Sequence, residues 1–313
     1  MLSRDDTILM TGATGFLGSW IIARLADKGV KVVATDISTD HRRLNMLRPG
    51  LARGAVDFRT CDVTDGAALE ALVAETRPTA IIHLAALQIP QCRSHPALAA
   101  AINVGGHVNV FEAARKSGID RVIYTSSIAA KPRGPAQAPS NLYGVFKKTD
   151  EEIARIYWQD HGLSSLGLRP YIVYGVGRDD GETSAITRAI EAAALGRDYE
   201  LPFRTRSSFQ YAGDVAEVFA IAAGRPWQGA LLSDVSDTVQ STDEVLEAIR
   251  VAVPESRVSG AEVERISPDS GFDTAALREV IGHWQETPLV DGIRETVALF
   301  REIAARAGGA VAG

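Results

Sequence analysis

Two residues four apart, Tyr143 and Lys147 in the stretch SNLYGVFKKTDEE, could form an acid–base device if this stretch is helical. Residues at that spacing lie on one helix face, about 5–6 Å apart between Cβ atoms. A lysine so placed favours the phenolate form of a tyrosine through its positive charge. The same spacing also occurs in ordinary helices with one aromatic and several solvated charges, so the surrounding elements must decide.

The stretch ILMTGATGFLGSWIIARLADKG predicts a dinucleotide site. An apolar strand runs into Gly12, Gly15 and Gly18, and an amphipathic helix follows. Glycines at this spacing permit a tight turn, a close approach of the backbone to a pyrophosphate, and close packing of helix on strand. The start of the helix offers N–H groups and a positive dipole to the phosphates.

An acidic residue, Asp36, ends the second predicted strand, 18 residues after Gly18. A carboxylate there accepts hydrogen bonds from the adenosine ribose hydroxyls and repels a 2′-phosphate. The next residue is Ile37 rather than arginine, so we expect NAD rather than NADP. Arg42 and Arg43 lie close by in the sequence and leave NADP as an alternative.

Composition excludes several classes of protein. The chain has 313 residues, of which 46% are hydrophobic and 23% charged, as in a globular protein with ample core. A net charge of −6 argues against a nucleic-acid partner. Two cysteines are too few for a disulfide framework, and the histidines lack metal-ligand spacing, so we expect no metal and a cytoplasmic location. No apolar run is long enough to span a membrane.

The first 170 residues alternate short apolar runs with amphipathic segments. The runs TILMTG, KVVATD, AVDFRTCD, TAIIHLAA, RVIYTSS and LSSLGLRP predict strands, and helical patterns cover residues 16–28, 66–76, 96–117 and 141–161. This alternation predicts an α/β fold, a Rossmann-type doubly wound parallel sheet with helices on both faces.

After Arg169 the regular alternation of strands and helices ends. Helices are predicted there near residues 183–196, 214–223, 242–252 and 288–307. We therefore expect two parts. An NAD-binding Rossmann domain would take residues 1–170 plus about 209–235, and a smaller C-terminal substrate-binding region about 171–208 and 236–313. The smaller part would close over the carboxyl edge of the sheet, where open α/β sheets bind ligands.

Over residues 6–220 the motifs resemble, in type and order, the extended short-chain dehydrogenase/reductase family of NAD-dependent epimerases and dehydratases. The resemblance rests on TGATGFLG, Asp36, CDVTD, HLAA, Asn103, TSS, the Tyr143/Lys147 pair and LRPYIVYG. It implies cofactor contacts from Gly12, Thr14, Gly15, Phe16, Leu17, Gly18, Asp36, Ile37, Asp62, Val63, Leu84, Ala85, Ala86, Asn103, Tyr143, Lys147, Pro170 and Ile172. Asp62 and Val63 would hold the adenine.

The resemblance also implies a catalytic set of Ser127, Tyr143 and Lys147. Tyr143 would exchange a proton with a substrate hydroxyl or carbonyl, Lys147 would bind the nicotinamide ribose, and Ser127 would orient the reacting oxygen, with Ser126 as its alternative. His83 is expected to be a hydrogen-bonded structural residue. A homodimer joined through the helices near 96–117 and 141–161 is expected as well.

Departures from the family pattern narrow the reaction. Ser127 is followed by Ile128 and Ala129, where the family's dehydratases carry an Asp-Glu pair that protonates the leaving hydroxyl. Ile172 stands where nucleotide-sugar epimerases usually have asparagine. These features favour an NAD-dependent dehydrogenase or reductase acting on a secondary alcohol or ketone of a polyhydroxylated small molecule. The alternatives are a nucleotide-sugar epimerase that retains its NAD and, less favoured, a non-catalytic NAD-binding sensor or scaffold.

Several cations could face an anionic substrate such as a sugar acid or a phosphate. They are Arg93, Lys131, Arg133, Arg178, Arg204 and Arg206. Arg178 and Arg204 are the preferred substrate contacts of this set, together with Ser126 and Ser127. The alternative for each cation is a solvated loop charge.

Overall fold

The structure, a computed structural model, describes residues 2–54, 56–265 and 271–309. In it the chain divides into two compact units. Unit 1 comprises Met1–Tyr171, Val215–Asp237 and Pro268–Trp284, and unit 2 comprises Ile172–Asp214, Thr238–Ser267 and Gln285–Gly313. The roles predicted for the two parts, NAD binding and substrate binding, stay predictions.

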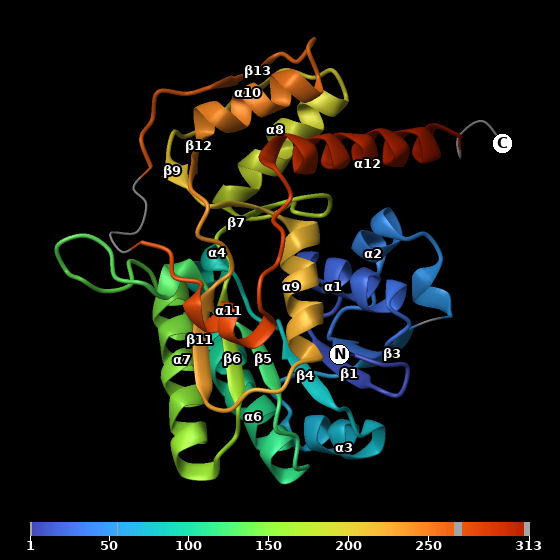
Figure 1. Cartoon of the computed structure of the whole chain (residues 1–313), viewed down its shortest axis with the longest axis vertical. Coiled ribbons are helices and arrows are strands. Elements are labelled where there is room, and N and C mark those ends of the chain that lie inside the picture. Colours follow the sequence, from blue (N-terminus) through green and yellow to red (C-terminus); the bar gives the residue numbers. More distant parts are fainter. Residues whose placement is uncertain (1, 55, 266–270, 310–313) are drawn as a thin grey trace. The chain divides into compact units, whose positions relative to one another are not determined.

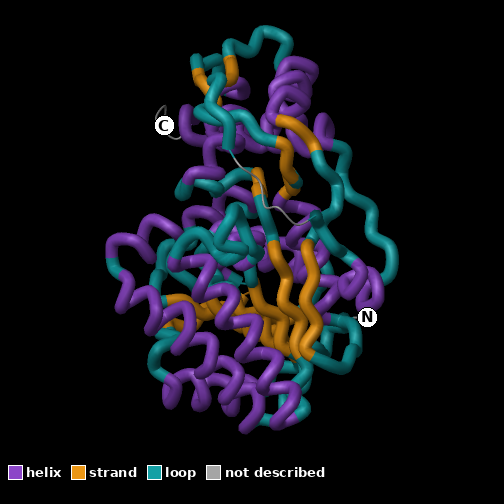
Figure 2. Tube along the Cα trace, turned by 90° about the vertical axis from the view of Figure 1, so that its left-hand side faces the viewer, coloured by secondary structure: helices purple, strands orange, loops and turns teal. Residues whose placement is uncertain are grey.

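Unit 1 is built on a seven-stranded sheet, counted over the described residues, in the order β11-β6-β5-β4-β1-β2-β3. All neighbouring strands are parallel. The strands are β1 (Thr7–Thr11), β2 (Lys31–Asp36), β3 (Val56–Thr60), β4 (Ala80–His83), β5 (Val122–Thr125), β6 (Ser165–Arg169) and β11 (Ala230–Asp234). Helices lie on both sides of the sheet (Figure 1; Figure 2). The order from β3 to β6 is that of a doubly wound dinucleotide-binding sheet, which confirms the predicted fold class.

Because the strands are parallel, their carboxyl ends meet at one edge of the sheet. Thr11, Asp36, His83, Thr125 and Arg169 are the last residues of β1, β2, β4, β5 and β6. The register holds them level, with Thr11 opposite Thr35 on one side and His83 on the other. This edge therefore gathers the segments that carry the predicted site.

The helices of unit 1 follow the predicted pattern closely. They are α1 (Phe16–Asp27), α2 (Arg42–Leu47), α3 (Gly66–Thr76), α4 (Ile89–Ser94), α5 (Pro96–Ala100), α6 (Gly106–Lys116), α7 (Leu142–His161), α9 (Ala212–Ala223, in this unit from Val215 on) and α11 (Ala275–Ile281), with 3₁₀ turns η1 (Leu51–Arg53) and η3 (Ile128–Ala130). The single helix predicted over 96–117 is interrupted by the π-helical turn η2 (Ala101–Gly105). Such π turns are rare and often mark functional sites.

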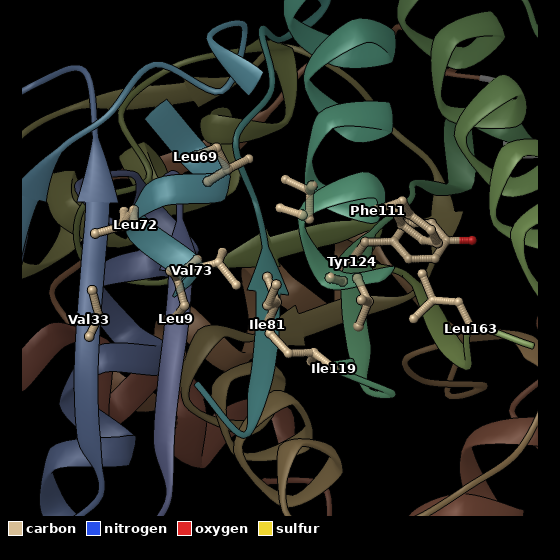
Figure 3. Packing of buried hydrophobic residues seen from close by; sticks show 14 of the residues in the cluster. Leu9, Val33, Leu69, Leu72, Val73, Ile81, Phe111, Ile119, Tyr124 and Leu163 are labelled. Atoms are coloured by element: carbon tan, nitrogen blue, oxygen red, sulfur yellow. The ribbon is translucent and has the colours of Figure 1, made fainter. Parts of the chain in front are cut away.

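One face of the sheet packs against α3, α6 and α7 in a continuous apolar core (Figure 3). Leu9 and Ile81 of the strands meet Val73 of α3 and Phe111 of α6, all 1% exposed or less. Alternate strand residues such as Ile8 point to the opposite face and are also fully buried. Burial on both faces explains why the strands read as apolar runs rather than as alternating patterns.

Unit 2 is made of short strand pairs and three longer helices. Its elements are β7 (Ile172–Tyr174), η4 (Glu182–Ser184), α8 (Ala185–Ala194), β8 (Tyr199–Leu201), β9 (Arg206–Ser207), β10 (Phe209–Tyr211), β12 (Gln240–Ser241), α10 (Thr242–Ala252), β13 (Val258–Gly260) and α12 (Leu289–Gly309). β7 pairs with β10 and β8 with β13 in parallel, whereas β9 and β12 are antiparallel. Ser241 and Glu244 form a capping box at the start of α10.

No helix within residues 2–54, 56–265 and 271–309 is long and apolar enough to cross a membrane.

We expect Phe111→Ala to lower the free energy of unfolding by about 3–5 kcal/mol, because the ring is fully buried and its loss leaves a cavity between α6 and the sheet. Chemical denaturation would measure the change. Val251→Ala is the control, since Val251 is 48% exposed, and it should cost less than about 0.5 kcal/mol. Equal costs for the two variants would contradict this assignment of the core.

Candidate active site

The glycine loop after β1 is pressed against the segment that follows β4. Gly12 has φ of +68°, and a Cβ added to it would lie 2.6 Å from the backbone nitrogen of Ala85 and 2.8 Å from the carbonyl carbon of Leu84. A Cβ on Gly18 would lie 2.6 Å from the carbonyl oxygen of Gly12. These two glycines are therefore required by the turn and by the packing of α1 on the loop.

The start of α1 is shaped to accept an anion. Gly15 is its N-cap, and among the described residues no side chain caps it and no acid stands in its first turn. Helix N-termini carry partial positive charge and N–H groups that suit phosphate. Phe16 and Leu17, two predicted cofactor contacts, are the first residues of this helix.

Asp36, at the end of β2, is tied to the same loop. Its Oδ2 accepts hydrogen bonds from the backbone N–H of Thr14 at 3.0 Å and from the Thr14 hydroxyl at 2.8 Å, and its Oδ1 accepts from the N–H of Ser38 at 3.1 Å. Thr14 thus orients the carboxylate predicted to meet the ribose. Arg43 donates to the carbonyl oxygen of Thr14 at 3.4 Å, so the alternative NADP-binding cation lies at this corner too.

The other predicted cofactor contacts near Asp36 follow β2 and β3. Ile37 is 66% exposed directly after Asp36. Asp62 caps its own turn by accepting from the N–H of Thr64 at 2.9 Å, and the carbonyl oxygen of Val63 accepts from Asn109 at 2.8 Å. These residues follow the ends of the neighbouring strands β2 and β3, and Asp36 is the last residue of β2. The contact of Asp62 and Val63 with adenine, and of Ile37 with the cofactor, stays a prediction.

Asn103 holds the segment after β4 in place. It lies in the π turn η2, is 1% exposed, and uses both ends of its amide on the backbone of Leu87, accepting from its N–H at 2.7 Å and donating to its carbonyl at 2.9 Å. That segment begins with Leu84, Ala85 and Ala86. The observed contact makes Asn103 a positioning residue, whereas direct contact with a cofactor stays a prediction.

Helix α7 begins unusually close to the end of β5. Asn141 caps it by accepting from the N–H of Gly144 at 2.9 Å. A Cβ on Gly144 would overlap the carbonyl oxygen of Ala129 in η3, so only glycine allows this approach. Tyr143 is held in the same contact, 8% exposed and packed with Ala129 and Cys92.

Lys147 lies one turn further along α7 and is 2% exposed. Its Nζ donates to the carbonyl oxygen of Thr125 at 2.8 Å and to Oδ2 of Asp150 at 3.2 Å. The bond to Thr125 fixes the ammonium at the carboxyl end of β5, two residues before Ser127. Both predicted members of the acid–base pair are therefore held at this edge.

The two serines after β5 differ in their contacts. Ser127 is half-buried, and its Oγ accepts from the N–H of Ala129 at 3.1 Å, which leaves its hydroxyl hydrogen for another acceptor. Ser126 is 2% exposed and donates its hydroxyl to Oε1 of Glu151 at 2.5 Å. This difference favours Ser127 over Ser126 as the substrate-orienting residue.

Sequence reasoning missed an ion pair between the end of β6 and α7, in which Glu151 is buried and Arg169 half-buried. Arg169, the last residue of β6, donates to both oxygens of Glu151 on α7, at 2.7 Å each. Glu151 also accepts from Ser126, so the ends of β5 and β6 are joined to α7. The sequence spacing could have indicated Glu151, because this residue follows Lys147 by four positions and so lies on the same side of the helix.

His83 is buried at the end of β4, as predicted for a structural histidine. Its Nδ1 is 2.7 Å from the hydroxyl of Thr11. Burial, with the nearby Lys147 charge, lowers the pKa of His83 to about 3, so the ring stays neutral. Within the described residues, no group of three or more His, Cys, Asp or Glu side chains is arranged to hold a metal ion.

The predicted substrate cations have partners within their own units. Lys131 is buried and donates to Asp234 at 2.5 Å, and Arg204 donates to Asp243 at 2.6 Å and to Glu262 at 3.0 Å. Arg178 donates to Thr183 at 3.0 Å. Of the other three cations, Arg133 lies over the ring of Tyr171. Arg93 is in α4 and Arg206 in β9. Convergence of Arg178 and Arg204 on a substrate stays a prediction.

The last two predicted cofactor contacts fall on either side of the division into units. Pro170 lies in unit 1 directly after Arg169, and its carbonyl oxygen accepts from the N–H of Ile128 at 3.3 Å. Ile172 begins β7 in unit 2 and is fully buried.

The residues of unit 1 fit a dinucleotide by their chemistry. The close approach at Gly12 leaves no room for a side chain, the start of α1 presents positive dipole, and Asp36 is oriented by Thr14. Further along the same edge stand Ser127, Tyr143 and Lys147, which suit proton transfer beside a hydride acceptor.

Comparisons with known proteins agree with this picture. The model of the NAD dependent epimerase/dehydratase family matches residues 8–231. UDP-glucose 4-epimerase from Mycolicibacterium smegmatis is 31% identical over 310 residues, covering 94% of this chain and 98% of that protein. The chain is thus similar to that enzyme over almost its full length.

Solved structures share the fold. UDP-glucose 4-epimerase from Thermus thermophilus, in complex with NAD, has a TM-score of 0.78 at 26% identity and covers 94% of this chain and 99% of its own. L-threonine dehydrogenase from Clostridium difficile has a TM-score of 0.82 at 20% identity, covering 95% and 98%. The second likeness concerns the fold alone.

We expect Gly144→Ala to lower catalytic turnover by about 10²-fold, because the added methyl group would push α7 off η3 and displace Tyr143. NAD content should fall much less than turnover, since the glycine loop that would receive the pyrophosphate is untouched. Gly308→Ala is the matched control, as Gly308 is exposed in α12 with open space around it. Turnover equal to that of the control would show that the close approach is dispensable.

Proposed function

The chain belongs to the NAD-dependent epimerase/dehydratase family, and we propose that within this family it is a nucleotide-sugar 4-epimerase that retains its NAD. The observation that carries the proposal is the Ser127, Tyr143 and Lys147 set at the end of β5, in a chain similar to a UDP-glucose 4-epimerase over nearly its whole length. The relatives move the preference from the dehydrogenase favoured by the sequence to this alternative.

In the proposed reaction Tyr143 takes the proton of a sugar hydroxyl while the hydride leaves the same carbon. NAD, when bound, supplies the hydride acceptor. Ser127 donates a hydrogen bond to the oxygen that changes between alcohol and ketone, and Lys147 stabilises the phenolate. If the hydride then returned to the other face of the ketone and Tyr143 returned the proton to the oxygen, the centre would be inverted without net oxidation.

Unit 1 is the proposed NAD-binding part, because the glycine loop, Asp36 and the Tyr143/Lys147 pair all belong to it. Dehydration is disfavoured, since Ile128 and Ala129 follow Ser127 as buried apolar residues and give no acid for a leaving hydroxyl. Unit 2 is the proposed substrate-binding part, with Arg178 and Arg204 as its proposed contacts.

A net dehydrogenase is the second candidate, and one observation favours it. Ile172 is fully buried in β7, so no side-chain amide stands where the family's nucleotide-sugar epimerases usually carry asparagine. A substrate that needs no such contact, such as a free sugar or sugar acid, would suit this feature.

We expect the purified protein to release NAD on heat denaturation and to convert UDP-glucose to UDP-galactose without accumulating NADH, as followed by NMR. Tyr143→Phe should keep its NAD and lose conversion by about 10²–10⁴-fold, because the proton acceptor is gone. Purification free of NAD, with reduction of added NAD by sugars or sugar acids, would instead establish the dehydrogenase. A protein inactive in both assays would contradict both proposals.

A homodimer through α5 and α7 is also proposed. Leu142, Val145 and Ile156 share one face of α7 and are 39–44% exposed, and Leu98 of α5 is 53% exposed. An apolar stripe of this kind on a helix face suits burial against a second copy.

We expect the protein to run as a dimer of the 33.4 kDa chain in light scattering, and Val145→Glu to yield monomers by placing a charge in the stripe. Val251→Glu, at a similarly exposed valine of α10, is the control and should leave the mass unchanged. A monomeric wild type would refute the interface.

A further inference from the structure

Asp150 is a carboxylate buried beside the catalytic lysine. It lies in α7, is fully buried, and accepts one hydrogen bond from Lys147 Nζ at 3.2 Å through Oδ2. Its Oδ1 has no hydrogen-bond partner among the described residues. A buried carboxylate with a single bond lowers stability unless a nearby charge compensates it. The compensating charge here is that of Lys147.

The contacts of Lys147 show what Asp150 does to it. An ammonium has three N–H donors. Two are directed to the carbonyl oxygen of Thr125 at 2.8 Å and to Asp150 at 3.2 Å. One donor is left for a ribose hydroxyl or for the phenolic oxygen of Tyr143. Asp150 therefore restricts the ammonium to one orientation and faces it with a negative charge.

The other titratable groups around this pair do not supply that negative charge. His107 of α6 is fully buried, and burial, with the nearby Lys147 charge, holds its pKa well below the ordinary value, so it is neutral. His83 is neutral for the same reason, its pKa being lowered by burial and by Lys147. Burial and the neighbouring Glu151 and Asp150 charges raise the pKa of Tyr124 well above its usual range, so this phenol is neutral too.

Glu151, the next residue of α7, is engaged elsewhere. Its two oxygens accept from Arg169 at 2.7 Å each, which balances its charge. Lys148 adds a more distant, surface contact at 3.5 Å. Within the described residues, Asp150 is therefore the carboxylate that forms an ion pair with Lys147.

We propose that Asp150 is a positioning residue for the reaction, which holds the Lys147 ammonium in place and offsets part of its charge, and so sets the pH at which Tyr143 becomes an active base. The proposal rests on the proposed role of Tyr143 and Lys147 in hydride-coupled proton transfer.

The direction of the effect follows from the sign of the charges. Burial raises the pKa of Asp150 to about 6, against the lowering effect of Lys147. Above that pH its ionised carboxylate opposes formation of a second negative charge on Tyr143. Below it the carboxyl group is neutral and the opposition is lost.

The size of the effect follows from distance. Asp150 follows Tyr143 by seven positions in α7, which is roughly 10 Å along the helix axis. At that distance, in surroundings of effective dielectric constant about 20, a unit charge shifts a titration by about one pH unit. Removing the carboxylate should therefore move activation of Tyr143 about one unit lower.

The test compares the wild type with Asp150→Asn, which keeps an acceptor for Lys147 and removes the charge. Glu152→Gln is the matched control, because Glu152 is an exposed acid of the same helix that pairs with Lys148 and Arg155. Two midpoints are measured. The first is the pH of half-maximal rate on the acidic limb of the pH–rate profile for UDP-glucose conversion. The second is the pH at which the phenolate absorbance of Tyr143 in the NAD-containing protein is half-maximal, obtained as the difference from the Tyr143→Phe form.

We expect both midpoints of Asp150→Asn to fall by about one pH unit, and those of Glu152→Gln to stay at the wild-type pH. Unchanged or higher midpoints in a folded, NAD-containing Asp150→Asn protein would overturn the proposal. Asp150→Ser, smaller and also neutral, gives the same test if the asparagine variant does not fold.

The phenolate measurement needs no substrate. It therefore separates failure of this proposal from failure of the proposed function. A protein that turns over no nucleotide sugar but shows the shifted phenolate midpoint would refute only the assigned reaction.

Discussion

The close approach of α7 to the carboxyl end of β5 is the constraint on which the candidate site depends. It exists because residue 144 has no side chain to meet the carbonyl oxygen of Ala129 and because Lys147 reaches the carbonyl oxygen of Thr125. Both contacts use backbone carbonyl oxygens of the segment around Ser127. Tyr143 precedes both contact residues on the first turn of the helix, and its position follows from theirs.

The segment after β4 joins the two halves of the site. On one side its backbone leaves no room for a side chain at Gly12, so it fixes the glycine loop. On the other side Leu87 is held by the amide of Asn103 in the π turn, and Cys92 of the following helix packs with Tyr143. A shift of this segment would therefore disturb the dinucleotide loop and the acid–base pair together. The short run of small and apolar residues 84–86, predicted to contact the cofactor, thus has a structural part in the candidate site although it carries no reactive group.

Much of this arrangement could be predicted from the sequence, and the remainder depended on contacts between distant residues. The strands β1 to β6, the glycine loop, Asp36 and the Tyr143/Lys147 pair follow from local patterns of glycine, apolar residues and spacing. Lys131 was one of six cations that could face a substrate or be solvated loop charges, yet it is buried against Asp234, far away in the sequence. The pairing of β11 with β6 likewise joins segments that are far apart in the sequence, and no local pattern in either strand predicts it.

Three consecutive acids on α7 show why a charge run cannot be interpreted from composition alone. Successive helical residues point about 100° apart, so Asp150, Glu151 and Glu152 enter three different surroundings. Glu152 pairs with surface cations, Glu151 is satisfied on both oxygens by Arg169, and the Asp150 carboxylate meets Lys147. The guanidinium of Arg169 is always charged, so the charge of Glu151 is balanced by a partner that does not titrate. Asp150 accepts one hydrogen bond, from Lys147, and its Oδ1 has no partner among the described residues. Burial raises the pKa of this carboxyl group to about 6, next to the predicted acid–base pair.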